Sequence, residues 1–580
     1  MFRVAKPGGQ RKEWKLRTCH RRQWLCLAAV LLFFIFFQSI VSLARHSRKG
    51  RPVNSVMPQL PLVERLHEGP VEALINAIRE VTVGVGGAES IAYSDADTWN
   101  WERKYPCQSR NEMVTRYSQV RKRKVLEPNS QWATVLQAYS ALHRTCMRKV
   151  GNVTRDFDDG TGNSSTGCKF LVVNLQHVGI GNKVVLLTSA VLYAILTQRV
   201  LLIPSHSYIP QTMCEPFLGS SWVLDETFPL PVPGWEDTLV GRWTGWESPV
   251  WKSTAFFEKG VDSARAGKRI DPLYALNVDH SHPEKQRFFC NTEQSYLTQV
   301  PWLYFHGCLY FLPKLFAIPA FRTPLEALFP DPSLALTNLV RTVMLPNDYV
   351  WQTVKQHDDT LFKNADQCVG IQVRFLWGKG VKFKHDNKRV NSHIKDCIAR
   401  EKLLPSIQDG LKSSFKQPVS RNPKVIQVLI TSLHTTLYDD LLQQYLEHET
   451  ITGDVVRVAQ ISHEGEQHFG ASADAQALVE ILLLSFVDDL IATPFSTFGG
   501  LAQAYGAIKP WFFETKILRK KARTCVRAQS IDVCYQRAQE YYDCPHDDDV
   551  DSLPIETVIP YIKSCSSVED NDGIQLMSVD

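Results

Sequence analysis

Two segments in the second half of the chain carry residue types that bind anions. Arg374 directly follows the apolar stretch 369–373, and Ser496, Thr497, Phe498 and Gly499 lie between a short apolar run and a helical pattern. A guanidinium can donate two parallel hydrogen bonds to a diphosphate and keeps its charge. Hydroxyl groups and backbone amides at the start of a helix form an anion site. Together the segments predict an anion site; the alternatives are a structural salt bridge at Arg374 and a simple N-cap at Ser496.

A third candidate is a glycine turn in the first half of the chain. Gly179, Gly181 and Asn182 follow the apolar stretch 169–174 and lead into a helical pattern. Glycine would let the backbone approach a substrate closely at the helix N-terminus. The turn is shorter than the dinucleotide fingerprint and lacks its third glycine, so a structural turn is the competing interpretation. We treat these residues as a candidate cleft loop.

Alternating strand and helix patterns must position these segments. In the first half, strands over 169–174 and 199–203 enclose a helix over 183–197 with one apolar face. In the second half, strands are predicted over 369–373, 425–430, 455–458 and 490–492, with helices over 437–446 and 473–486. Such alternation predicts parallel sheets covered on both faces. Ligands bind these sheets at the carboxyl ends of the strands, where Arg374 lies.

Several classes of protein lose support. The chain has no GxSxG, P-loop lysine motif or HExxH, which are typical of hydrolases, kinases and zinc proteases. Acidic DxD pairs begin at Asp95, Asp156 and Asp549, but none follows an apolar strand, so we expect no essential metal and no cofactor. The first 23 residues carry a charge of +7 and the whole chain +5, which leaves −2 for the rest. The body therefore gives no reason to expect a nucleic-acid partner.

The N-terminus has the pattern of a signal anchor. Residues 1–23 hold eight Lys and Arg against one Glu, and residues 24–43 contain no charged side chain. Twenty uncharged, mostly apolar residues can cross a hydrocarbon core of about 30 Å, and the excess of basic charge before the span places the tail in the cytoplasm. A cleaved signal peptide is the alternative, but its apolar region is shorter, about 7–15 residues. The body is therefore expected to be lumenal.

Cysteine use agrees with an oxidising compartment. Twelve cysteines lie in the body, an even number that predicts disulfides but leaves their pairing open. No Cys-x-x-Cys pair occurs, which argues against zinc ribbons and thioredoxin-like motifs. Asn152 and Asn163 stand in glycosylation sequons, which are usable only if this part of the chain faces the lumen.

Together these segments resemble the plant xyloglucan fucosyltransferase family (glycosyltransferase family 37). The resemblance extends over about residues 99–576 and rests on the order and spacing of short motifs. These are GIGNK (179–183), CEPFLGSSW (214–222), FFC (288–290), VPWL (300–303), VGIQVR (369–374), EKLLP (401–405), STFG (496–499), AQ (502–503), KPW (509–511) and the cysteines at 525, 534, 544 and 565.

The resemblance implies an α/β, GT-B-like fold with two Rossmann-like domains facing a cleft, preceded by a transmembrane helix and a stem. The expected parts are a cytoplasmic basic tail (1–23), a signal-anchor helix (24–43), a stem (44–95), an N-terminal acceptor-side domain (96–365), a C-terminal GDP-fucose-binding domain with a disulfide-rich end (366–568) and a polar tail (569–580). It also implies a single-pass type II protein of the Golgi membrane.

The implied reaction is inverting transfer of L-fucose from GDP-β-L-fucose to the 2-hydroxyl of galactose, without a metal. In such enzymes the arginine matching Arg374 holds the diphosphate, and the loop matching Ser496 to Gly499 helps to bind GDP. The expected partners are GDP-fucose, a galactose-terminated polysaccharide or proteoglycan (xyloglucan or arabinogalactan protein), the Golgi membrane and a second copy of the chain in a homodimer. Neither a catalytic base nor the choice of acceptor follows from the sequence.

One departure from the family keeps another class of function open. The family has an Asp-Asn pair after the VPWL stretch, and the corresponding residues here are Cys308 and Leu309, flanked by His306. This departure favours an inactive Golgi protein that binds glycan or acts as a scaffold. Arg374 and the 496–499 loop favour the enzyme, because a scaffold needs no diphosphate site. A protein O-fucosyltransferase, which uses the same donor, is a third alternative.

Overall fold

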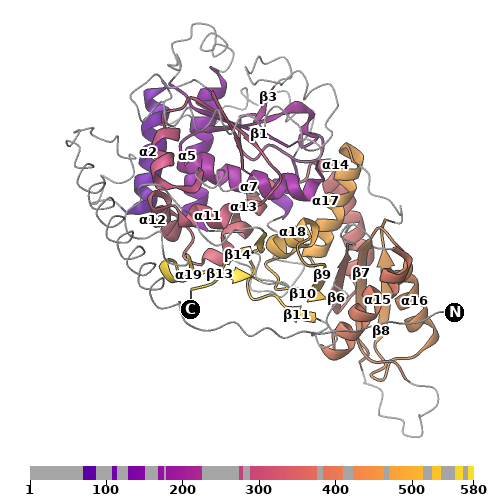
Figure 1. Cartoon of the computed structure of the whole chain (residues 1–580). Helices are drawn as coiled ribbons and strands as arrows, with labels where there is room; N and C mark the ends of the chain where they lie inside the picture. The colour runs from indigo at the N-terminus through magenta and orange to yellow at the C-terminus, as the bar shows by residue number, and fades with distance from the viewer. Residues whose placement is uncertain are drawn as a thin grey trace, which may run out of the picture. The chain divides into compact units, whose positions relative to one another are not determined.

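The computed structural model describes thirteen stretches of the chain: 69–86, 107–113, 129–149, 167–175, 178–224, 273–278, 288–374, 383–408, 422–462, 469–513, 525–536, 555–565 and 573–579. All of them belong to one compact unit, Gln59–Asp580. Within these stretches the chain forms two larger sheets and one small antiparallel sheet, with helices packed on them (Figure 1).

The first sheet contains five parallel strands in the order β3-β2-β1-β5-β4. Its strands are β1 (Phe170–Asn174), β2 (Val200–Pro204), β3 (Val223–Leu224), β4 (Leu273–Asn277) and β5 (Trp302–His306). Phe170 is in register with Val200 on one side and Trp302 on the other, which makes β1 the central strand. β1 and β2 are buried along their whole length, as expected for apolar strands covered on both faces.

The second sheet contains six strands in the order β11-β10-β9-β6-β7-β8. Its strands are β6 (Gln367–Val373), β7 (Val425–Ser432), β8 (Val455–Gln460), β9 (Asp489–Ala492), β10 (Trp511–Phe513) and β11 (Cys525–Arg527). All neighbours are parallel except β10 and β11. The strands predicted for this half of the chain are confirmed.

The helices connect and cover these strands. They are α2 (Pro70–Gly84), α5 (Ser130–Met147), α7 (Ile180–Leu196), α10 (Asn291–Leu297), α11 (Leu312–Ala317), α12 (Pro319–Leu328), α13 (Ala335–Val343), α14 (Asp348–His357), α15 (Phe383–Arg400), α16 (Thr436–Glu447), α17 (Ala471–Ser485), α18 (Thr497–Gly506) and α19 (Ile555–Val558). The short turns are η3 (Ser205–Ser207), η6 (Pro332–Leu334) and η7 (Asp358–Phe362). The helix predicted over 183–197 begins three residues earlier, because Gly179 occupies the N-cap position.

One hydrophobic core joins the two halves of the chain. It contains the first sheet together with buried residues of α17 and α18, such as Leu482 and Leu501. A second core lies between β6, β7 and β9 and the helices α15 and α16, around Ile371, Ile394 and Leu437. In Figure 1 the magenta helix α7 lies beside the orange helices α17 and α18, which it contacts. The start of α7 is thereby brought close to elements of the second half.

Part of the segment predicted as a stem packs on the body. Residues 70–84 form α2, which contacts α5 and α12. Leu74, Ile75 and Ile78 of this helix are buried. Their spacing places them on one face, and burial of that face stabilises the helix. The range 44–95 therefore contains a segment that belongs to the packed body.

Four disulfides are described: Cys107–Cys214, Cys146–Cys168, Cys397–Cys525 and Cys534–Cys565. Cys290 is also disulfide-bonded, whereas Cys308 and Cys368 keep the thiol form. Cys534–Cys565 lies at a three-stranded antiparallel sheet of β12 (Tyr535–Gln536), β13 (Ile562–Cys565) and β14 (Gly573–Leu576). The prediction of disulfides is confirmed, and the structure supplies pairings that the sequence left open.

Several predictions fall outside the described residues. These are the signal anchor (24–43), the sequons at Asn152 and Asn163 and the three DxD pairs. Among the helices that the structure does describe, none has both the length and the apolar character needed to cross a membrane.

Candidate functional site

The second sheet reverses its strand order between β6 and β9. From β6 the chain adds β7 and then β8 on one side, and β9 and β10 follow on the other side. Open α/β sheets bind ligands at such a switch point, outside the carboxyl ends of the strands. Arg374 follows the end of β6, and Thr493 follows the end of β9. The backbone amide of Arg374 donates to Thr493 Oγ1 at 2.8 Å, so the two strand ends are joined at this point.

The side chain of Arg374 is half-buried. Burial lowers the pKa of its guanidinium from the ordinary value, because a charged group loses hydration there. An arginine nevertheless remains protonated in proteins. The location at the switch point agrees with the interpretation of Arg374 as a ligand-binding side chain.

The loop from β9 into α18 carries the other predicted anion-binding residues. Phe495 has a φ of 58°, a left-handed conformation that a bulky residue rarely adopts. Ser496 is the N-cap of α18 by position, but its side chain makes no capping hydrogen bond. The Ser496 hydroxyl is buried and has no hydrogen-bond partner among the described residues. A simple N-cap therefore does not account for this serine.

The three residues after Ser496 have different surroundings. Thr497 is the first residue of α18, and Phe498 packs against the larger hydrophobic core. A Cβ on Gly499 would lie 2.9 Å from Gln372 Oε1 and 3.1 Å from Ala492 Cβ. Glycine at 499 thus lets the start of α18 pack directly on β6 and β9. The first backbone amides of a helix have no partner within the helix, so this helix start sits against the switch point with amides available for an anion.

The candidate cleft loop meets this helix start. Gly179 is the N-cap of α7, and Gly181 and Asn182 lie in its first turn. The Thr497 hydroxyl donates to Asn182 Oδ1 at 2.8 Å. A Cβ on Gly181 would lie 2.6 Å from Thr497 Oγ1. The close approach of α18 therefore leaves no room for a side chain at 181 and gives this glycine a structural role.

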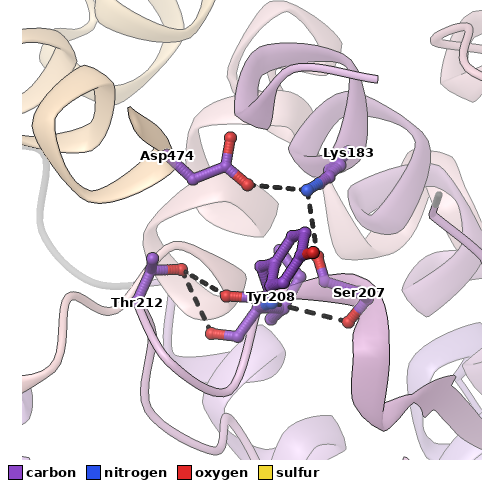
Figure 2. Close-up of polar contacts among 6 residues, drawn as sticks. Lys183, Ser207, Tyr208, Thr212 and Asp474 are labelled. Carbon is purple, nitrogen blue, oxygen red and sulfur yellow. Dashed lines mark hydrogen bonds and ion pairs between the residues drawn. The ribbon is translucent and has the colours of Figure 1, made fainter. Parts of the chain in front are cut away.

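A buried ion pair holds α7 close to α17 (Figure 2). Lys183 Nζ lies 2.6 Å from Asp474 Oδ2, and the two side chains are only 4% and 5% exposed. Lys183 also donates to the Ser207 carbonyl at 3.0 Å. Asp474 accepts a further hydrogen bond from the Ile180 backbone amide; burial raises the pKa of this carboxyl, and Lys183 opposes the shift. Sequence reasoning missed this pair, although a lysine in an apolar helix face was a usable signal.

The first sheet has its own switch point, between β1 and β5. β2 and β3 extend the sheet on one side of β1, and β5 and β4 lie on the other. Asn174 ends β1 and His306 ends β5, in register with each other. Asn174 Nδ2 lies 3.5 Å from His306 Nδ1. Asn174 was missed from the sequence, although a polar residue at the end of an apolar strand is a recognisable signal.

Comparison with known proteins adds a family to this geometry. A family model described as xyloglucan fucosyltransferase matches residues 103–545. The galactoside 2-alpha-L-fucosyltransferase of Arabidopsis thaliana is 31% identical over 471 residues, which cover 78% of this chain and 79% of that protein. Probable fucosyltransferase 8 of the same plant is 32% identical over 440 residues, 74% of this chain and 83% of that protein.

One solved structure is similar in both sequence and fold. It is a point mutant of Arabidopsis thaliana FUT1 in complex with GDP, with a TM-score of 0.65 and 28% identity. The match covers 84% of this chain and 98% of that chain. The α/β arrangement of parallel sheets and helices is thus similar to that of FUT1.

Proposed function

Since the chain belongs to the xyloglucan fucosyltransferase family, we propose that it transfers L-fucose from GDP-β-L-fucose to the 2-hydroxyl of galactose. The proposed acceptor is a cell-wall glycan, either xyloglucan or an arabinogalactan protein. The relative described as a galactoside 2-alpha-L-fucosyltransferase supports this linkage. The GDP complex of FUT1 supports the donor.

The observation that carries the proposal is the arrangement at the β6–β9 switch point. A guanidinium at the end of one strand and a helix start after the other strand can approach the same diphosphate. The buried Ser496 hydroxyl, which has no partner among the described residues, offers a donor for a phosphate oxygen. We therefore assign GDP to Arg374, Ser496, Thr497 and the neighbouring amides, with Phe498 and Gly499 shaping the loop.

The chemistry follows from where charge develops. As the bond between fucose C1 and the β-phosphate oxygen breaks, its electron pair remains on GDP and adds negative charge there. Arg374 and the amides at the start of α18 would stabilise that charge without a metal ion. The oxygen of the galactose 2-hydroxyl attacks C1 from the opposite face, which inverts the anomeric centre, and the hydroxyl proton passes to a base or to water. We place the acceptor at the β1–β5 switch point, beside Asn174 and His306.

Two alternative functions compete with galactoside fucosylation. An inactive glycan-binding or scaffolding protein is favoured by Cys308 and Leu309, which stand where the family has Asp and Asn. A protein O-fucosyltransferase would use the same donor but would fucosylate serine or threonine.

The proposal also includes a single-pass type II topology in the Golgi membrane with a lumenal body, supported by the 24–43 span. It further includes a homodimer, which light scattering of the purified protein would test.

The test is turnover of GDP-fucose by the full-length protein in detergent micelles, with EDTA present. Galactosylated xyloglucan oligosaccharide, arabinogalactan and a folded protein domain with accessible serine and threonine serve as acceptors in parallel assays. Linkage analysis of a fucosylated product identifies the 2-hydroxyl. GDP binding is measured on the same preparation by calorimetry.

The outcomes separate the alternatives. Product with either glycan supports the enzyme and identifies the acceptor. GDP binding without product on either glycan, but with product on a folded protein domain, supports a protein O-fucosyltransferase. A folded protein with neither turnover nor GDP binding contradicts the proposal and supports the scaffold.

A further inference from the structure

Tyr208 has an unusual backbone conformation. Its φ is 62° and its ψ 0°, in the left-handed region, which is rare for a bulky side chain. The Thr212 hydroxyl donates to the Tyr208 carbonyl at 3.2 Å and to the Ile209 carbonyl at 3.1 Å. Figure 2 shows Thr212 and Tyr208 side by side in this turn. The turn therefore keeps Tyr208 in a conformation that an asparagine or glycine would adopt more easily. Strained residues of this kind cluster at binding and catalytic sites.

The ring of Tyr208 is held against a charged group. Lys183 Nζ lies 5.2 Å from the ring centroid, within the range of a cation–π contact. The ammonium group is itself fixed by Asp474 and by the Ser207 carbonyl. One face of the ring is thus anchored on a buried, nearly rigid support.

The tyrosine is nevertheless exposed. Tyr208 keeps 43% of its surface accessible, although its turn is tightly hydrogen-bonded and its neighbour Ser207 is buried. An aromatic ring with one anchored face and an accessible remainder can stack on the C–H groups of a sugar, and its hydroxyl reaches water. Within the described part of the chain, neither the left-handed backbone of Tyr208 nor its exposure is explained by packing.

The location fits an acceptor sugar. Tyr208 follows the carboxyl end of β2 in the first sheet, next to β1, on the edge where such sheets bind ligands. It is connected to the proposed donor site by short contacts. The ring lies on Lys183, the adjacent residue Asn182 accepts a hydrogen bond from Thr497, and Thr497 begins the GDP-binding helix.

We propose that Tyr208 is a stacking platform for a hexopyranose residue of the acceptor glycan. This inference rests on the proposed function, because it assumes that the first sheet receives the acceptor. Its role is acceptor binding, so GDP affinity should not depend on it.

The test compares two variants of the full-length protein. Tyr208→Asn removes the ring but suits the left-handed backbone, and Tyr208→Phe retains the ring. We expect Tyr208→Asn to raise the acceptor KM, and the Kd for the same oligosaccharide in the presence of GDP, about tenfold. Its Tm should stay the same or rise, and its Kd for GDP should be unchanged. Tyr208→Phe should stay within about twofold of the wild type in both acceptor constants.

A matched control isolates the effect of backbone strain. Lys402 is exposed and also has a left-handed φ, 54°, so Lys402→Asn relieves similar strain in the loop after α15. It should leave the acceptor KM and Kd unchanged.

Wild-type acceptor affinity in Tyr208→Asn overturns the inference, as does an equal loss of acceptor affinity in Tyr208→Phe. Because binding of xyloglucan and arabinogalactan oligosaccharides is measured directly, absence of turnover counts against the proposed function. If the wild-type protein binds GDP but neither oligosaccharide, the proposed role of Tyr208 as a stacking platform is overturned too.

Discussion

Thr497 and Asn182 are 315 residues apart in the chain, and the hydroxyl of one donates to Oδ1 of the other at 2.8 Å. Thr497 begins α18 and Asn182 lies in the first turn of α7. The contact therefore joins the starts of two helices that follow β9 and β1, at the carboxyl edges of two different sheets. A site assembled from both sheets depends on how closely these two helix starts approach.

The first prediction concerns this approach. Gly181→Ala places a Cβ 2.6 Å from Thr497 Oγ1, and the overpacking should lower the free energy of unfolding by about 1–3 kcal/mol. GDP affinity should fall with it, because α18 is displaced. Chemical denaturation and calorimetry measure the two effects. Adding Thr497→Ala removes the clashing oxygen and should restore part of the stability. Gly84→Ala is the control, since no atom lies within 4 Å of that Cβ.

Arg374→Ala should weaken GDP binding by about a hundredfold or more and leave the fold intact. The physical reason is loss of a charged, forked donor at the switch point. Calorimetric titration with GDP and a thermal melt are the measurements. Arg457→Ala removes the same charge from the exposed edge strand β8 and should bind GDP normally. Unchanged GDP affinity in Arg374→Ala would remove Arg374 from the site.

Ser496→Ala should separate binding from stability. The buried hydroxyl has no partner among the described residues, so its removal should leave the unfolding free energy unchanged or raise it by about 1 kcal/mol. GDP binding should weaken about tenfold, because a donor to the phosphate is lost. Thermal melts with and without GDP report both effects. A variant that loses stability in the absence of GDP would mean that the hydroxyl has a structural partner.

The Lys183–Asp474 pair predicts strong non-additivity. Lys183→Met or Asp474→Leu alone leaves one buried charge unpaired and should cost about 3–5 kcal/mol of unfolding free energy. The double variant should recover most of this loss, because two buried charges are replaced by apolar side chains. The control is Lys363→Met, which removes an exposed ion pair to Asp359 and should cost less than about 1 kcal/mol. Additive losses in the double variant would contradict the prediction.

His143 predicts acid sensitivity of the fold. Burial lowers its pKa from 6.5 to about 4, so it is neutral in the folded state and protonates more readily when unfolded. Above pH 6.5 the imidazole is neutral in both states, and the free energy of unfolding does not depend on it. As the pH falls from 6.5 towards 4, the unfolded state gains a proton that the folded state does not, and the free energy of unfolding decreases by up to about 1.4 kcal/mol per pH unit. Unfolding titrations between pH 4 and 7 measure the slope.

The matched variant for this slope is His143→Gln, whose amide can donate to the Leu201 carbonyl and accept from Ser220, the two partners of the imidazole. Burial raises the pKa of Asp532 to about 7, which gives a slope of opposite sign over the same range. The difference between wild type and variant therefore isolates the histidine. Equal slopes in the two proteins would refute the assignment.

Much of the fold was accessible from local patterns. Neighbouring residues determine the hydrophobic pattern of the strands at 170–174 and 367–373 and the glycine turn before α7, so these elements can be predicted locally. Residue type and position at a strand end are also properties of the sequence, and from them the sequence predicts anion binding by Arg374 and the 496–499 loop. The start of α7 was misplaced by three residues, since helix boundaries depend on cap geometry.

What the sequence alone determined is therefore part of the set of strands and helices and the family resemblance, and from it anion binding by two segments is predicted. Only the tertiary structure decided which of these meet. Lys183 and Asp474 are 291 residues apart, and no local pattern couples them, because their contact arises from the packing of α7 against α17. The strained turn at Tyr208 likewise appears only in the tertiary structure, as does the Ser496 hydroxyl that has no hydrogen-bond partner in the described stretches. Both depend on surrounding elements that fix the backbone.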